Sequence, residues 1–303
     1  MTVEGEAEGT RSVDPPGGPA QPALVLVATP IGNLGDLSPR AMAALRDADA
    51  VLCEDSRVTG GLLARQGIAA TMIPLHDHNE AAQAPRLVER MKAGERFALV
   101  SDAGTPLVSD PGFRLVRAAI EAGIAVSAVP GPNAAVMALA LSGLPPHPFL
   151  FLGFLPARAG PRAADLARLR GVERAGLSAT LVFFEAPHRL GEALAAMAEA
   201  FGADRPAAVA RELTKRFEEV RRGTLADLAA HYATAEARGE ICIIVGPAPE
   251  EAVGEDELDA RLRAALAAGL SLRDAAASVA AATGLRKREV YARALELAGD
   301  GQG

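Results

Sequence analysis

The sequence predicts an α/β protein with two sheet-containing domains and a small helical domain at its C-terminal end. Short apolar runs alternate with amphipathic stretches from residue 23 to about 144, which is typical of a mostly parallel sheet covered by helices. A second set of apolar runs follows the Pro-rich segment Leu144–Pro148 and continues to Gly246. The expected organisation is a leader over 1–22, α/β domains over 23–146 and 147–248, and a helical domain over 255–299.

The leader and the first domain differ sharply in pattern. Residues 1–22 are rich in Gly, Pro and acidic side chains and lack apolar periodicity, so we expect them to be disordered. Ser38 before Pro39 and Asp110 before Pro111 are typical helix starts. The buried strands expected in this domain are Leu24–Ala28, Ala50–Cys53, Phe97–Ser101 and Ala125–Val129.

The second domain shows strand runs that suggest some antiparallel pairing. Pro187 and Thr224 mark the starts of helices that lie between these strand runs. The expected strands are Phe149–Gly153, Thr180–Phe184, Ala207–Leu213, Glu218–Arg222 and Ile241–Val245.

Three helical patterns follow the second Pro-rich segment. A capping box at Ser271 and Asp274 begins the middle helix, and Gly284 separates the last two helices. A helix pair with a Gly turn is typical of a helix-turn-helix, and a plain three-helix cap fits the pattern equally well. The expected helices are about Asp256–Ala268, Leu272–Ala282 and Arg286–Leu297.

Composition restricts the location and the class of the protein. The apolar runs are too short to span a bilayer, and the start of the chain lacks a secretion signal pattern, so a cytoplasmic protein is expected. Cys53 and Cys242 lie in strand-like runs and are expected to be buried thiols. The net charge of −7 argues against a general nucleic-acid binder, although a local basic surface is compatible with it.

Two loops carry the strongest functional signal. Ala28–Asn33 and Ser101–Gly112 each follow a strand run and precede a helical stretch, which is where α/β sheets bind ligands. Their Gly, Pro and small hydroxyl residues let the backbone approach a ligand closely. Neither loop carries the glycine fingerprint of a dinucleotide site or of a phosphate loop. We therefore predict a backbone-lined pocket for another kind of ligand.

At these loops the sequence resembles the tetrapyrrole methylase superfamily of S-adenosylmethionine-dependent enzymes. The resemblance covers roughly residues 23–246, and the C-terminal helices resemble a domain that some family members carry. Gly104-Thr105-Pro106 stands where the general pattern is Gly-Asp-Pro, as in the RNA-modifying branch. The matching segments are Val27–Asp36, Cys53–Arg57, Ser101–Gly112, Pro130–Ala134, Phe183–Arg189, Arg211–Lys215 and Gly239–Glu240.

The resemblance implies 2′-O-methylation of a cytidine in 16S rRNA of the small ribosomal subunit, near the decoding centre, by a homodimer. A tetrapyrrole methyltransferase of the same fold is the main alternative, since an acidic porphyrinoid would also suit Arg clusters. A non-catalytic RNA-binding module is a second alternative. A Rossmann oxidoreductase is disfavoured by the missing glycine fingerprint.

The resemblance also implies that S-adenosylmethionine lies between the two α/β domains, held mainly by backbone. An aromatic ring such as Phe184 can stack on its purine, whereas of the neighbours Phe183 and Phe184 at least one must face the core. The implied cofactor-binding residues are Pro30, Asp102, Gly104, Thr105, Leu107, Val108, Ala134, Ala135, Phe184, Ala186, Leu213, Gly239 and Glu240.

A ribose hydroxyl is a poor nucleophile, so a base or a charge that stabilises the developing oxyanion helps methyl transfer. The main catalytic candidates are Glu54, Asp55, His188 and Lys215, and Asp102, Glu185 and Glu212 are further candidates. Alternatives remain open: a loop hydrogen bond for Asp102, salt bridges for Glu54 and Asp55, and capping or packing for His188. His76-Asp77-His78 lacks a further ligand, so no metal site is expected.

RNA binding requires basic surface, and two groups of cations supply candidates. A solvated face is the alternative interpretation of each group. The first group is Arg158, Arg162, Arg168, Arg170 and Arg174, and the second is Lys215, Arg216, Arg221 and Arg222.

Overall fold

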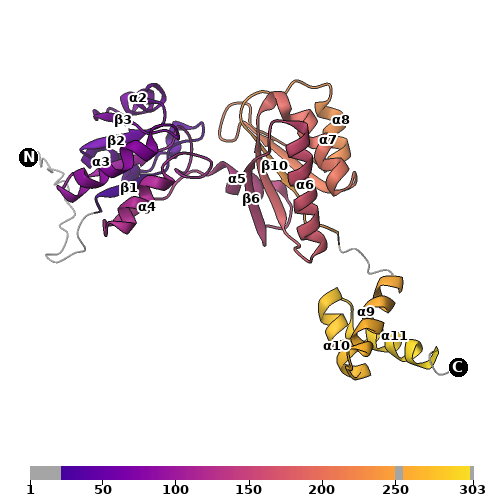
Figure 1. Ribbon diagram of the computed structural model, residues 1–303. Helices are drawn as coiled ribbons and strands as arrows, with labels where there is room; N and C mark the ends of the chain where they lie inside the picture. Colours follow the sequence, from indigo (N-terminus) through magenta and orange to yellow (C-terminus); the bar gives the residue numbers. More distant parts are fainter. Residues whose placement is uncertain (1–21, 250–254, 301–303) are drawn as a thin grey trace, which may run out of the picture. The chain divides into compact units, whose positions relative to one another are not determined.

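The structure is a computed structural model that describes residues 22–249 and 255–300 (Figure 1). The chain forms two compact units, an α/β unit up to Pro247 and a helical unit from Ala248. The leader expected over 1–22 lies outside the described residues except for its last position. Within the described ranges, no helix is both long and apolar enough to cross a membrane.

The first sheet is entirely parallel, with the strand order β3-β2-β4-β1-β5. Side chains alternate between its faces, so that Leu52 packs with Leu87 and Leu115 while Val51 packs with Leu45 and Leu63 on the opposite side. The strands are β1 (Leu24–Val27), β2 (Ala50–Cys53), β3 (Met72–Pro74), β4 (Phe97–Val100) and β5 (Val126–Val129).

Helices cover both faces of this sheet, as the alternating pattern predicts. Ser38 caps α1 by accepting a hydrogen bond from the Ala41 amide, as expected. The expected helix start at Asp110 is wrong: α4 begins after Gly112, and the Asp110 side chain therefore does not cap this helix. The helical segments are η1 (Leu34–Asp36), α1 (Pro39–Asp47), α2 (Ser56–Arg65), α3 (Glu80–Lys92) and α4 (Phe113–Glu121).

The second sheet is mixed, with the strand order β6-β7-β10-β8-β9. Only the β6–β7 pairing is parallel, which agrees with the antiparallel pairing suggested by the sequence. The strands are β6 (Phe149–Phe154), β7 (Thr180–Glu185), β8 (Pro206–Arg211), β9 (Glu219–Thr224) and β10 (Ile241–Val245).

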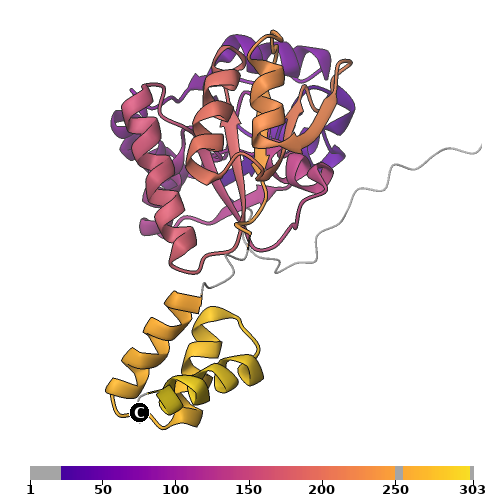
Figure 2. The ribbon, with the colours of Figure 1, turned by 90° about the vertical axis from the view of Figure 1, so that its right-hand side faces the viewer.

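One face of the second sheet packs against three helices, visible in front of the strands in Figure 2. Phe183 is fully buried there and contacts a core that includes Leu194 and Val209. Thr224 begins the last of these helices with a capping box to Asp227. The segments are α6 (Ala159–Arg174), η2 (Pro187–Arg189), α7 (Leu190–Phe201) and α8 (Leu225–Tyr232).

Helix α5 (Ala134–Ser142) covers the other face of the second sheet, although it directly follows the last strand of the first sheet. Ala138 and Leu139 pack against Val182, Ala208 and Ile244. Its position before the Pro-rich segment predicts that this helix belongs to the first domain. The helix packs on the second sheet instead. The boundary between the two halves in space therefore differs from the boundary that the Pro-rich segment marks in the sequence.

The helical unit consists of α9 (Glu255–Ala267), α10 (Leu272–Thr283) and α11 (Lys287–Asp300). Leu262, Ala276 and Val290 form its core. The Arg293 guanidinium lies 2.7 Å from the Asp259 carboxylate, joins α11 to α9, and holds the pKa of Asp259 below its ordinary value.

The two cysteines are free, buried thiols on different sheets, as expected. Burial raises the pKa of both thiols, that of Cys242 to about 12. Both are therefore protonated near neutral pH and pack as small apolar residues.

Candidate functional site

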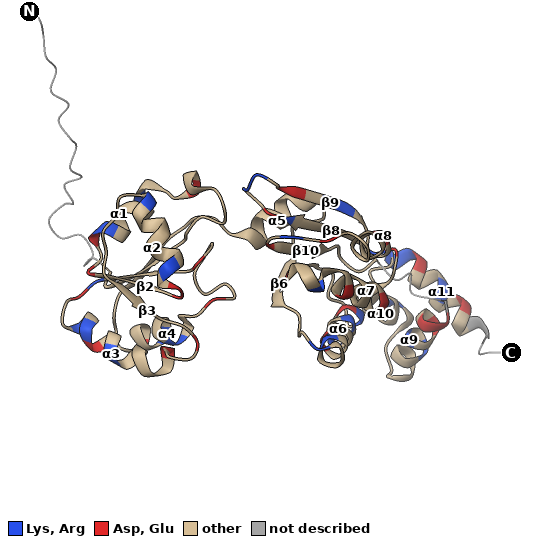
Figure 3. Cartoon of the chain, turned by 90° about the horizontal axis from the view of Figure 1, so that it is seen from above, with Lys and Arg blue, Asp and Glu red and all other residues tan. Residues whose placement is uncertain are grey.

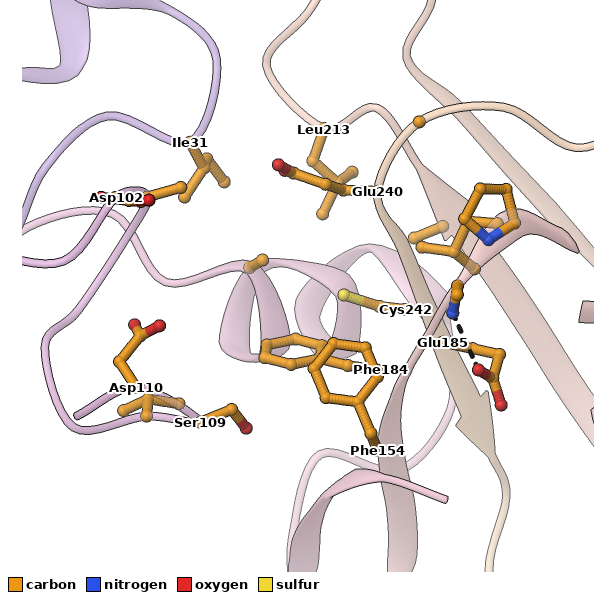
Figure 4. Close-up of a pocket in the computed structure, with 18 residues that line it drawn as sticks. Ile31, Asp102, Ser109, Asp110, Phe154, Phe184, Glu185, Leu213, Glu240 and Cys242 are labelled. Atoms are coloured by element: carbon orange, nitrogen blue, oxygen red, sulfur yellow. Dashed lines mark hydrogen bonds between the residues drawn. The ribbon is translucent and has the colours of Figure 1, made fainter. Parts of the chain in front are cut away.

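A pocket of about 400 Å³ is formed by loops from both halves of the α/β unit (Figure 4). The first half contributes the strand-end loops singled out in the sequence, and the second half contributes the ends of β6, β7 and β10. Its volume falls within the range of small-molecule sites, roughly 300–1,000 Å³. The lining residues outside the predicted set are Ile31, Ala103, Ser109, Asp110, Phe154, Glu185, Pro187, Ala210, Ile241 and Cys242.

Most of the predicted cofactor-binding residues line this pocket. The residues that do so are Asp102, Val108, Ala134, Phe184, Ala186, Leu213, Gly239 and Glu240. Pro30, Gly104, Leu107 and Ala135 do not line it but directly adjoin lining residues in the chain, and Thr105 lies two residues from the lining residue Ala103. The backbone of Gly104 pairs with Thr29 through both its N–H and its carbonyl, and the Thr105 hydroxyl donates to the Pro132 carbonyl. In this structure, these two residues shape the loops.

The backbone is strained in two of the lining loops. Leu107 and Ser109 have φ values of 72° and 67°, and Glu212 and Thr214 have 51° and 64°. Among the described residues, these are the non-glycine positions in the left-handed region. Each such conformation costs on the order of 1–3 kcal/mol and typically occurs at binding sites. The strain therefore coincides with the pocket.

The loops of the two halves touch beside the pocket. The Asn33 amide donates a hydrogen bond of 3.1 Å to Thr214 Oγ1. A Cβ at Gly32 would lie 2.3 Å from Lys215 Cγ, so only glycine allows this approach.

One wall of the pocket is acidic. Asp102 and Asp110 line it, and burial together with the neighbouring charges of Asp102 and Asp77 raises the pKa of Asp110, against the effect of a hydrogen bond from Ser101. Burial and the charges of Asp102 and Asp110 also raise the pKa of Glu54. Such a concentration of carboxyl groups favours a ligand with positive charge.

The facing wall is aromatic. The ring of Phe184 lies 4.9 Å from that of Phe151 and 5.6 Å from that of Phe154, centroid to centroid. Of the neighbours Phe183 and Phe184, the first is the core residue and the second faces the pocket. Sequence reasoning missed Phe154, although its place at the end of an apolar strand run was an available signal.

Lys215 lies between two carboxylates near the pocket. Its Nζ is 2.8 Å from Glu212 Oε1 and 3.3 Å from Glu240 Oε2. Burial alone would lower the pKa of Lys215, but the hydrogen bond to Glu212 and the charge of Glu240 outweigh it and raise the pKa. Lys215 is therefore a cation near neutral pH, held in place from both sides.

The other catalytic candidates have clear local roles. Asp55 caps α2 and pairs with Arg57, whose hydrogen bonds lower the pKa of Asp55 to about 2. Glu185 is fully buried, pairs with Arg189 at 2.9 Å, and its carboxylate points away from the pocket to the Ala186 amide. His188 is exposed and lines a neighbouring cavity.

The sequence His76-Asp77-His78 brings two imidazole rings to a centroid distance of 6.0 Å. In residues 22–249 and 255–300, no group of three or more His, Cys, Asp or Glu side chains is arranged to hold a metal ion.

The predicted Arg clusters are largely engaged with other protein groups. On α6, Arg162 is buried and lies 3.2 Å from Glu192, and Arg168 lies 3.5 Å from Asp165. Arg222 donates to the carbonyl groups that end α5, and Arg221 pairs with Glu219. Figure 3 shows acidic and basic residues interspersed on these elements. The clusters are thus weaker support for RNA binding than their spacing suggests.

Residues 23–229 match the family of tetrapyrrole (corrin/porphyrin) methylases, and residues 252–298 match the RsmI C-terminal HTH domain. The chain therefore belongs to the tetrapyrrole methylase family. The second match favours the helix-turn-helix interpretation of the C-terminal helices over a plain cap.

Curated relatives refine this assignment. A ribosomal RNA small subunit methyltransferase I from Mesorhizobium japonicum is 50% identical over 95% of this chain and 97% of its own length. A protein of the same name from Xylella fastidiosa (strain Temecula1) is 48% identical, covering 88% of this chain and 97% of its own. Within the family, the chain belongs to the group of ribosomal RNA small subunit methyltransferase I.

The fold also matches a solved structure of uroporphyrin-III C-methyltransferase from Thermus thermophilus, complexed with S-adenyl homocysteine. The TM-score is 0.51 and the identity 21%, over 74% of this chain and 96% of that one.

Proposed function

We propose that this chain transfers a methyl group from S-adenosylmethionine to the 2′-oxygen of a cytidine in 16S rRNA of the small ribosomal subunit, near the decoding centre. The observation that carries the proposal is a pocket with one acidic and one aromatic wall, in a member of this family. Relatives of nearly full length bear the name of a ribosomal RNA small subunit methyltransferase.

The residues present fit this cofactor. S-adenosylmethionine supplies a methyl group on a cationic sulfonium, which leaves as a neutral thioether. Asp102 and Asp110 complement the positive charges of its sulfonium and ammonium groups. Phe184 offers a ring for the adenine, and Gly239 allows close approach of the backbone.

Lys215 is proposed to stabilise the negative charge that develops on the attacking ribose oxygen. Its ammonium group is positively charged near neutral pH and is held by Glu212 and Glu240. Because the group is already in position, little rearrangement of the protein is needed when the charge develops. Glu54 directly follows β2, near Asp102 and Asp110 of the acidic wall, and burial together with their charges raises its pKa; we propose that it takes up the proton. Positioning of the ribose by the pocket accounts for the remainder of the catalysis.

A homodimer in the cytoplasm is proposed as the working form. Large apolar side chains are exposed on α5, at Val136 and Met137, and on β6, at Phe149 and Leu150. Burying such side chains against a second copy would be favourable. Light scattering should give about twice the chain mass of 31.1 kDa; a monomer at micromolar concentration would refute the dimer.

The proposed function is tested by mass spectrometry of 16S rRNA nucleosides from a strain lacking the gene. Loss of one 2′-O-methylcytidine, restored by the purified protein acting on small subunits, is the expected result. Methylation of a porphyrinoid but not of small subunits would support the tetrapyrrole alternative and overturn the proposal. Modification at a base atom would overturn only the 2′-oxygen assignment.

A further inference from the structure

A further cavity, of about 350 Å³, lies behind the loop that connects β8 to β9. This loop, residues 212–218, separates two concave surfaces: Leu213 lines the pocket described above, and Glu212 and Phe217 line this further cavity. Residues 235–238 and the end of α8 complete its wall. We call this cavity the β8–β9 groove.

Phe217 is the most unusual residue of the groove. It is 64% exposed, and it lies in the same loop as Lys215. The Arg216 guanidinium lies over this ring, with its Cζ 5.5 Å from the centroid. An exposed ring beside a guanidinium is the arrangement on which nucleobases stack.

Three arginines line the groove, Arg211, Arg221 and Arg238, together with the carboxylates of Glu212, Glu219 and Glu236. Arg211 and Arg221 share one carboxylate, that of Glu219, at 2.7 and 3.1 Å, so these two positive charges are not neutralised one for one. Arg238 pairs with Glu236, but both side chains are more than 80% exposed, at 83% and 84%. Exposed pairs contribute little, and such a guanidinium can turn to a phosphate.

We propose that the β8–β9 groove binds a single-stranded ribonucleotide adjacent to the nucleotide that is methylated. Phe217 stacks on its base, and Arg238 and Arg221 contact the neighbouring phosphates. This inference rests on the proposed function and names a substrate contact that the cofactor pocket does not supply. Because residues 212–218 also carry Leu213 and Lys215, RNA seated on Phe217 orders the loop that borders the pocket.

The chain contains no tryptophan, which allows a direct test. Phe217→Trp places a single indole at the proposed stacking position, and its fluorescence should be quenched when unmethylated small subunits from a strain lacking the gene are added. Phe113→Trp is the matched control, because Phe113 on α4 is also 64% exposed. The inference is overturned if the fluorescence of the indole at position 217 does not change when small subunits are added. It is also overturned if that fluorescence changes only with the concentration of the protein itself, in the absence of RNA.

Kinetics provide the second measurement. Phe217→Ala should raise the KM for small subunits by about five- to one-hundred-fold, the loss expected for one base stack. Its affinity for S-adenosylmethionine should be unchanged, and Phe113→Ala should match the wild type. If the wild type methylates small subunits and Phe217→Ala has the same KM, the inference is wrong and the proposed function stands. If the wild type does not methylate them, both fall.

Discussion

The amide of Asn33 donates a hydrogen bond to Thr214 Oγ1 across 3.1 Å, although the two residues are 181 positions apart. This bond joins a loop of the first sheet to the strained loop that carries Lys215. Thr214→Val removes the acceptor while keeping the shape of the side chain. We expect S-adenosylmethionine to bind about fivefold more weakly, since one hydrogen bond contributes about 1 kcal/mol. Calorimetry checks this, with the exposed Thr71→Val as the control; equal affinities would show that the bond does not support the site.

Gly239 is expected to tolerate no side chain. A Cβ there would lie 2.0 Å from Glu212 Oε1 and would displace the carboxylate that holds Lys215. Gly239→Ala should lower cofactor affinity at least tenfold, measured by calorimetry. Gly123→Ala is the matched control, because its φ of 74° resembles the 81° of Gly239 but its Cβ would meet nothing within 4 Å. If both variants lose only stability, crowding at Glu212 is not important for binding.

Lys215→Met tests the proposed charge stabilisation. Methyl transfer to small subunits should fall by roughly 10²–10³, as for other groups that stabilise a developing oxyanion. The dissociation constant for S-adenosylmethionine should change less than tenfold. Lys92→Met, which removes a surface lysine paired with Glu89, should leave both quantities unchanged. Because the pKa of Lys215 is raised, the wild-type rate should show no loss through deprotonation of this group between pH 7 and 9. A loss of cofactor binding equal to the loss of rate would contradict the assigned role.

The variant Asp110→Asn is expected to raise the stability of the fold and to weaken cofactor binding. Because burial raises the pKa of Asp110 in the folded state, its contribution to stability is present below its ordinary pKa and is lost as the pH rises through the raised value. The variant should therefore melt at a higher temperature than the wild type at pH 7, and the difference should shrink in acid.

The variant Asp110→Asn should nevertheless bind the cofactor about fivefold more weakly, because one carboxylate no longer faces the sulfonium. Wild-type affinity should fall as acid protonates Asp110, whereas the affinity of the variant should respond less. Calorimetry between pH 5 and 8 measures both; unchanged affinity at pH 7 would exclude Asp110 from the cofactor site.

The start of α11 provides a test of RNA binding by the helical unit. Replacing Arg286, Lys287 and Arg288 with Ala should weaken RNA binding and reduce its salt slope by about 0.7–0.9 for each lost phosphate contact. Arg261→Ala, on α9, is the control, since that guanidinium already pairs with Glu257. Cofactor affinity should not change in either variant. An unaltered salt slope in the triple variant would leave the helical unit without this role.

Most strands follow from the sequence because buried runs flanked by turn residues leave few alternatives. β3 was missed because it has three residues, partly exposed, and ends at a proline. The strand expected over Ala207–Leu213 ends at Arg211, since Glu212 takes a left-handed conformation that no ladder accommodates. Packing of α5 on the second sheet could not be predicted either, because a helix that is apolar on all sides, with a serine only at its last position, does not indicate which sheet it covers.

The site was predictable to the level of loops. Small residues after strands indicated where the pocket lies, but not which side chains face it. Asp-Pro is a common helix start and predicts a cap at Asp110, whereas the N-cap of α4 is Gly112, a glycine at positive φ two residues later. The Arg clusters failed as a simple basic surface because linear spacing does not reveal pairing partners such as Glu192.

The position of α5 determines how this protein can be divided. A fragment that starts after the Pro-rich segment would carry every strand of the second sheet but expose the face containing Val182, Ala208 and Ile244 to water. A fragment that ends at the Pro-rich segment would carry α5 without the sheet face on which it packs. Cutting before Pro130 instead keeps α5 with the sheet it covers. Split-protein reassembly, circular permutation or exchange of halves between relatives should therefore succeed at the earlier junction and yield aggregates at the later one.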